Sequence, residues 1–175
     1  MRVDQAGGQE LEWRQPEALR KSYQLTGDGG ELATLRFESA FGSLAAGECG
    51  AGKWTFKRSG FLSPKVTVRP AGLESSLAVF TPGWMGNGWV VFSWGRRYHL
   101  KHTSFWGTEW VFEAEDGTPV VTLSAKTGFL KQGGISTVAP SAAGLQEAPI
   151  LLLLIWYVRV LMNEDDAAAV VAATG

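Results

Sequence analysis

One long apolar segment, APILLLLIWYVRVLM at residues 148–162, most constrains the fold of this 175-residue chain. Its 15 residues span about 22 Å as an α-helix, less than the roughly 30 Å hydrocarbon core of a bilayer. Arg159 interrupts the segment, and a charge inside a membrane is costly. No Lys or Arg lies between Gln132 and Val158 to orient an insertion. The segment therefore predicts a buried core helix, with a C-terminal membrane anchor as the alternative.

The chain before this segment has the two-residue period of β-strands. Residues 53–58 alternate aromatic and polar side chains, and residues 66–69 repeat the alternation. Residues 77–80 and 89–94 are more continuously apolar, which predicts strands buried on both faces. Other strands are predicted at residues 23–26, 32–37, 97–102, 109–113, 119–123 and 135–138, with a hairpin turn at Asp116-Gly117.

A helix that is apolar on every side needs apolar contact around its whole circumference. A sheet packed on one side would leave the rest in water, at about 25 cal/mol per Å² of exposed apolar surface. A closed barrel encloses the helix and also removes the sheet edges. We therefore predict a mainly β protein, a closed antiparallel barrel that surrounds a C-terminal helix at about residues 148–162.

The domain boundaries follow from the same pattern. We expect a flexible N-terminus over residues 1–10, one barrel domain over residues 11–163, and an acidic, alanine-rich tail over residues 164–175. The acidic triplet Glu164, Asp165 and Asp166 is unfavourable at a helix C-terminus, so it predicts the helix stop, followed by a frayed or weakly helical tail over residues 167–175. The N-terminus lacks the apolar segment of a secretory signal. A lone cysteine excludes an intramolecular disulfide, so we expect a cytoplasmic protein.

Several segments, in this order, carry a resemblance to a known family: YQL from Tyr23, KWTFKRSGF from Lys53, GRRYHL from Gly95, TEWVF from Thr108 and PILLLLIWY from Pro149. They resemble the tubby C-terminal-like superfamily, which groups tubby domains, phospholipid scramblases and plant LURP-one-related proteins. The resemblance covers residues 11–163 and implies a barrel of about 12 antiparallel strands around a central helix. Tubby domains bind phosphoinositides and scramblases act on bilayers, so it implies a lipid-related function as an expectation.

No motif in the sequence predicts catalysis. The segment GECGAGK at residues 47–53 satisfies G-x-x-x-x-G-K, but Trp54 follows where a nucleotide site needs Ser or Thr. The next residues alternate as a strand instead of forming a helix, which predicts a glycine-rich loop between strands. His99 and His102 lie three apart on a predicted strand and so point to opposite faces, a poor geometry for one metal. We expect no enzymatic activity, metal or cofactor.

Charge is unevenly distributed along the chain. Residues 51–106 carry eight basic residues and one acidic residue, a net charge of +7, whereas residues 1–50 and 107–175 carry −3 and −5. Adjacent basic strands would attract anionic headgroups, at about 1 kcal/mol for each cation near the surface. The predicted lipid-binding residues are Lys57, Arg58, Arg69, Arg96, Arg97 and Lys101. In the alternative interpretation, acidic residues from the rest of the chain interleave with these strands and neutralise them.

Two functional hypotheses follow. The first is a non-catalytic tubby-like domain that binds anionic phospholipid headgroups, peripheral to a membrane; the second is a scaffold or protein-interaction domain without lipid binding. Nucleic acid is not expected. A buried Arg159 must reach the barrel mouth or pair with a carboxylate, or else it is an anion ligand. Trp84 in a predicted loop is either an interfacial anchor or folded back over the barrel end.

Overall fold

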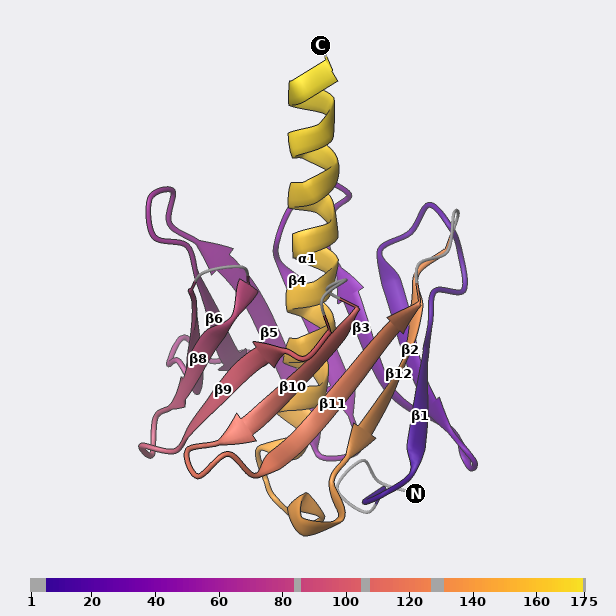
Figure 1. Ribbon diagram of the computed structural model, residues 1–175, viewed down its shortest axis with the longest axis vertical. Helices are drawn as coiled ribbons and strands as arrows, with labels where there is room; N and C mark the ends of the chain where they lie inside the picture. The colour runs from indigo at the N-terminus through magenta and orange to yellow at the C-terminus, as the bar shows by residue number, and fades with distance from the viewer. Residues whose placement is uncertain (1–5, 84–85, 105–107, 127–130, 175) are drawn as a thin grey trace.

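A closed antiparallel barrel surrounds the C-terminal helix in the computed structural model, which describes residues 6–83, 86–104, 108–126 and 131–174 (Figure 1). Each strand pairs with its neighbours in sequence, and the last strand pairs with the first. The elements are β1 (Glu10–Arg14), β2 (Ser22–Gly27), β3 (Gly30–Phe37), β4 (Ala45–Cys49), β5 (Gly52–Ser59), β6 (Lys65–Pro70), β7 (Ala78–Pro82), β8 (Gly88–Phe92), β9 (Arg97–His102), β10 (Glu109–Ala114), β11 (Pro119–Lys126), β12 (Gly133–Val138), η3 (Pro140–Ala142) and α1 (Ala148–Thr174). The predicted fold class is confirmed.

Strand residues alternate between the barrel interior and its outer wall, because successive side chains leave a strand on opposite faces. This alternation corrects the prediction that residues 77–80 and 89–94 are buried on both faces. In β8, Val90 and Phe92 are buried, whereas Trp89 and Val91 are 39% and 42% exposed on the outer wall. The barrel has a single interior, which the helix fills, and nothing in the described chain covers its outer surface there.

Two strands, β1 and β4, were not among those predicted from the sequence. The β4 segment AAGEC has little of the apolar alternation that marks a strand, and its partner strands hold it in place. Upstream of β1, the Gly8 amide donates to the Val138 carbonyl at 2.8 Å, and Ala6 is fully buried. The chain is therefore already attached to β12 before β1 begins.

Helix α1 is longer than predicted. Its residues 148–161 are buried in the barrel, but the helix continues through the acidic triplet to Thr174, so the triplet does not stop it. Lys21 pairs with Glu164 at 2.7 Å and Arg58 pairs with Asp165, which offsets the unfavourable charge. The alanine-rich residues beyond have high helix propensity. The end of the helix therefore projects from the barrel, as Figure 1 shows.

Aromatic side chains from the first strands pack against the buried helix. Trp13 stacks on Trp156 with ring centroids 5.0 Å apart, and Tyr23 meets the same indole edge-on at 5.5 Å. Phe37 stacks on Tyr157 at 5.4 Å. These contacts join the two ends of the sequence, so the barrel closes around α1 through the N-terminal strands.

Glu147 anchors the start of α1. Its carboxylate is fully buried and accepts a hydrogen bond from Trp94 Nε1 at 2.9 Å and another from Arg96 Nη1 at 3.5 Å. Its backbone carbonyl accepts a hydrogen bond from the Leu151 amide at 2.9 Å, and this bond closes the first turn of the helix. A negative charge at a helix N-terminus is favourable. Glu147 thus joins the helix to the β8–β9 turn.

Replacing Glu147 by alanine is expected to lower the free energy of unfolding by about 2–3 kcal/mol, because a buried hydrogen bond to a charged group is worth about that much. Thermal unfolding measures the loss. Glu115→Ala is the matched control, since Glu115 pairs with Arg97 on the surface and exposed pairs contribute little. Equal losses in the two variants would contradict the anchoring role of Glu147.

Candidate functional site

The two ends of the barrel differ. We call the end where α1 leaves the barrel the helix-exit end. The β1–β2, β3–β4 and β5–β6 loops lie there, around the projecting helix (Figure 1). The opposite end holds the start of α1 and the β8–β9 and β10–β11 turns.

The six predicted lipid-binding residues do not come together at either end. Lys57 and Arg58 lie near the helix-exit end of β5, but Lys57 points outward whereas Arg58 reaches inward to α1. Arg69 lies near the end of β6 that is opposite the helix exit, and Arg96 and Arg97 lie at the β8–β9 turn, also at the opposite end. Lys101 lies between the two ends, on the outer wall of β9.

Acidic residues pair with five of these six residues, as the alternative interpretation proposed. Most partners come from the acidic last third of the sequence, which the barrel topology brings beside the basic strands. The pairs are Arg58–Asp165, Arg69–Glu74 at 3.4 Å, Arg96–Glu147 at 3.5 Å, Arg97–Glu115 at 2.8 Å, and Lys101–Glu113. Lys57 has no carboxylate partner among the described residues.

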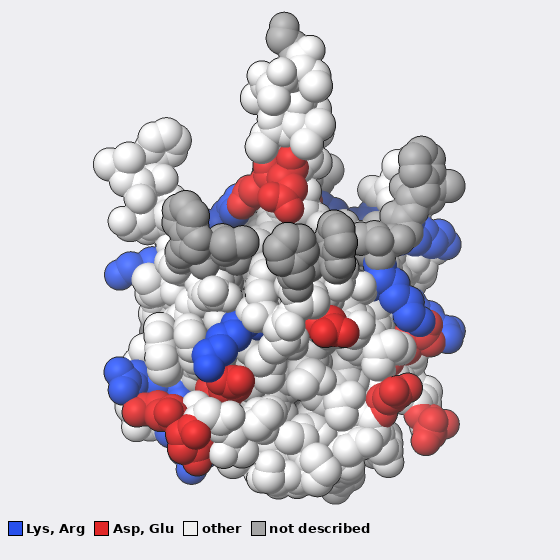
Figure 2. Space-filling model, in the orientation of Figure 1, with Lys and Arg blue, Asp and Glu red and all other residues white. Residues whose placement is uncertain are grey.

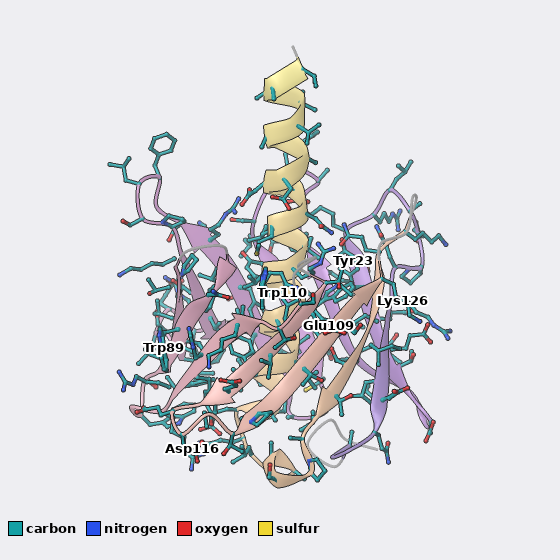
Figure 3. The ribbon with its side chains drawn as sticks, in the orientation of Figure 1. Tyr23, Trp89, Glu109, Trp110, Asp116 and Lys126 are labelled. Atoms are coloured by element: carbon teal, nitrogen blue, oxygen red, sulfur yellow. The ribbon has the colours of Figure 1, made fainter. Side chains whose placement is uncertain are left out.

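Apolar side chains are exposed at the tips of the helix-exit loops. Leu19, Phe41, Phe61 and Leu62 have exposed fractions of 91–103%, the highest among the large hydrophobic residues that the structure describes. They come from three loops that surround the projecting helix (Figures 1 and 3). Single exposed apolar residues are ordinary on a protein surface, so the informative feature is that these four lie at the same end of the barrel. Sequence reasoning missed these four residues, because an isolated apolar residue in a loop does not show whether it folds back.

Cations flank these apolar tips. In the β5–β6 hairpin, Lys57, Arg58 and Lys65 surround Phe61 and Leu62, and no acidic residue occurs between Glu48 and Glu74. In the neighbouring loops, Arg20 and Lys21 follow Leu19 but pair with Glu17 and Glu164, and Arg36 precedes Phe41. Figure 2 shows basic residues along the rim of this end, with an acidic cluster only where the helix emerges on the visible face. The β5–β6 hairpin is therefore both apolar at its tip and basic at its base.

The glycine-rich segment and the two histidines lie in the strands and a hairpin of the barrel. Residues 47–53 form the β4–β5 hairpin, so the G-x-x-x-x-G-K segment leads into a strand. His99 stacks on Trp89 at 4.5 Å on the outer wall, whereas His102 packs on Trp110 at 3.8 Å on the inner side. The prediction that the two imidazoles point to opposite faces is confirmed. Among the described residues, no cluster of three metal-ligating side chains occurs.

Burial, with a smaller contribution from the charge of Arg159, lowers the pKa of His102 below 6.5. The unfolded chain therefore binds a proton that folded His102 rejects, so we expect the free energy of unfolding to fall as the pH drops from about 7.5 to 5. Acidic groups with a lowered pKa, such as Glu12, change the free energy of unfolding only below about pH 4.5, where they begin to bind protons. Urea unfolding across this range should show a shallower pH dependence in His102→Gln. An unchanged dependence would contradict a neutral, buried His102.

Arg159 is buried, with 7% exposure, and forms no salt bridge with a described carboxylate. Of the three expectations for Arg159, pairing with a carboxylate is therefore not seen among the described residues, and a position at the barrel mouth or a role as an anion ligand remain. Trp84, the predicted loop anchor, lies outside the described residues. No helix in the described part of the chain is long and apolar enough to cross a membrane.

The comparisons with known proteins support the fold. No family model matches the chain, and no curated protein matches it. Among solved structures, it is similar to the X-ray structure of a protein from Arabidopsis thaliana, with a TM-score of 0.51 and 13% sequence identity. That similarity covers 85% of this chain and 93% of the other. At this identity the likeness shows the fold alone.

Proposed function

We propose that this chain is a non-catalytic member of the tubby C-terminal-like superfamily that docks on anionic membranes through the helix-exit end of its barrel. The observation that carries the proposal is the placement of Leu19, Phe41, Phe61 and Leu62, each almost fully exposed, in three loops of one end. The similarity to the Arabidopsis thaliana structure supports the fold on which the family assignment rests.

The apolar tips and the flanking cations would act together at a lipid surface. Full burial of a Phe or Leu side chain is worth about 1.5–3 kcal/mol, and each nearby cation adds about 1 kcal/mol on an anionic surface. Lys57 and Lys65 have no carboxylate partner among the described residues, so their charges are available to headgroups. Insertion of the tips supplies the larger share, and the cations make binding depend on anionic lipid.

This proposal revises the set of headgroup ligands. Lys57 remains a headgroup contact, together with Lys65 and Arg36 at the same end. Arg58 instead holds α1 through Asp165, at 3.0 Å between Nη2 and Oδ1. Arg69, Arg96, Arg97 and Lys101 pair with carboxylates on the outer wall and at the opposite end, away from the proposed docking face.

Flotation with vesicles tests the proposal. The purified full chain is mixed with phosphatidylcholine vesicles, with or without phosphatidylserine, at low and high salt. We expect flotation with phosphatidylserine vesicles that decreases at high salt, because screening weakens the contribution of the cations. Equal flotation with both vesicle types, or none from a folded protein, would contradict the proposal.

A second candidate function is protein binding through the outer wall of β8. Trp89 and Val91 are 39% and 42% exposed there, at alternate positions of the strand. This patch favours the scaffold hypothesis, in which lipid plays no part. A chain that stays unbound in the flotation assay but captures a protein partner, and loses it in Trp89→Ser, would support this function instead.

A further inference from the structure

A stripe of three side chains on α1 faces the helix-exit ends of β11 and β12. Trp156, Arg159 and Asn163 are spaced at i, i+3 and i+7, which places them on one side of the helix. They line a cavity of about 220 Å³ together with Lys126 and Gln132. Lys126 lies at the helix-exit end of β11 (Figure 3). The cavity is far larger than the about 30 Å³ that one water molecule occupies.

Two buried donors beside this cavity lack partners. Arg159 Nε and Trp156 Nε1 are buried without a hydrogen bond among the described residues, in side chains of residues that are 7% and 1% exposed. Both are donors. Native proteins satisfy nearly all buried donors, because each one left alone costs a substantial desolvation penalty. Gln132 Oε1 is a third group without a partner, and its amide can rotate to present NH₂ instead.

The charge of the cavity is positive. Arg159 has no carboxylate within salt-bridge distance in the described chain, and Lys126 adds a second cation to the lining. Asp166 interacts electrostatically with Arg159 without forming a salt bridge. Tyr23 and His102 are the other titratable groups that interact electrostatically with Arg159. Burial lowers the pKa of Arg159, as expected of a desolvated guanidinium that no contacting anion compensates.

We infer that this cavity binds a phosphate group, with the Arg159 guanidinium as its principal donor and the Trp156 side chain in its wall. A guanidinium presents several N–H donors in a planar fork that matches phosphate oxygens, and a desolvated site strengthens such bonds. The cavity shares Lys126, Gln132 and Gly133 with an open groove of about 500 Å³ on the outer wall. That groove leaves room for the remainder of a phosphate ester. The inference does not rest on membrane docking, since either a soluble phosphate ester or a lipid headgroup supplies this chemistry.

A phosphate titration tests the inference. The full chain is titrated with sodium phosphate at constant ionic strength, and the indole N–H signals are followed by ¹H–¹⁵N NMR, with Trp156→Phe identifying the Trp156 signal. We expect that signal to move on titration and Arg159→Met to weaken binding at least about tenfold. Because Arg159→Met removes a buried charge without a salt-bridge partner, we expect it to fold.

Two further variants sharpen the test. Arg159→Lys keeps the charge but loses the planar fork, so we expect it also to bind phosphate more weakly than the native chain. Lys53→Met is the charge-matched control, because Lys53 is an exposed residue paired with Glu48 near the opposite end. It should bind phosphate like the native chain. Equal weakening by Lys53→Met and Arg159→Met would overturn the inference, since it would show a non-specific charge effect.

The source of the phosphate is decided by a second arm with phosphatidic acid in phosphatidylcholine vesicles. Arg159-dependent binding of inorganic phosphate in solution supports the inference, even if no vesicle binds and the proposed membrane function fails. Arg159-dependent binding of the vesicles alone supports a lipid headgroup as the occupant. No Arg159-dependent effect in either arm would overturn the inference and assign the cavity to water, while leaving flotation through the loop tips unaffected.

Discussion

Replacing Trp13 by alanine is expected to lower the free energy of unfolding by about 3–5 kcal/mol, the range for truncating a buried aromatic side chain. Trp13 is fully buried, stacks on Trp156 and donates from Nε1 to Ser136 Oγ at 3.2 Å. The variant therefore loses apolar burial, a ring contact between β1 and α1, and a buried hydrogen bond. For a chain of this size the melting temperature should fall by roughly 6–20 °C.

The control for this prediction is Trp89→Ala. Trp89 lies on the outer wall, where it stacks on His99 and contacts Arg97. Its loss should cost under about 1.5 kcal/mol, since the contacts of a surface aromatic are worth about that at most. Similar melting temperatures for the two variants would show that the contact of β1 with the helix is not a main source of stability.

Replacing Phe61 and Leu62 together by serine is expected to weaken binding to phosphatidylserine vesicles by about 100-fold. Both side chains are almost fully exposed, so the fold should keep its melting temperature. Partial insertion of two such side chains is worth about 3 kcal/mol, and each 1.4 kcal/mol is a factor of ten in affinity. Cosedimentation over a range of lipid concentrations measures the change.

Leu73→Ser is the matched control for this double variant. Leu73 is 57% exposed in the β6–β7 loop, at the end opposite to the proposed docking face. It should bind vesicles like the native chain. If Leu73→Ser loses as much binding as the double variant, docking does not use the helix-exit end. Lys57→Ser with Lys65→Ser should lose less, about 30-fold at low salt, and should become less sensitive to salt.

The sequence predicted several elements because their signals are local. The Asp116-Gly117 turn needs only a residue that tolerates positive φ, and Gly117 has a φ of 84° with Asp116 Oδ1 accepting from the Thr118 amide. Strand β4 had no such signal, since AAGEC is weakly patterned and is held by its neighbours. The helix end was also missed, because the partners of its acidic triplet come from distant strands.

The candidate site depended even more on tertiary structure. The +7 segment predicted a basic patch, but net charge along a sequence does not show which acids a barrel brings alongside. Glu113 and Glu115 of the last third face Lys101 and Arg97 across the β9–β10 pair. The exposed loop tips and the unpartnered donors near Arg159 are likewise properties of packing, which no local pattern reports.

The sequence by itself predicted the barrel around a helix, because the all-round apolar segment at residues 148–162 is too short to span a bilayer and period-two strands can enclose it. Only the tertiary structure decided which loops surround the helix exit and which charges remain without a partner there. Burial of the helix can be predicted from the apolar composition of its segment and from the two-residue period of the strands. The positions of Phe61, Lys57 and Arg159 relative to one another are set by strand order and register, which join residues far apart in the chain.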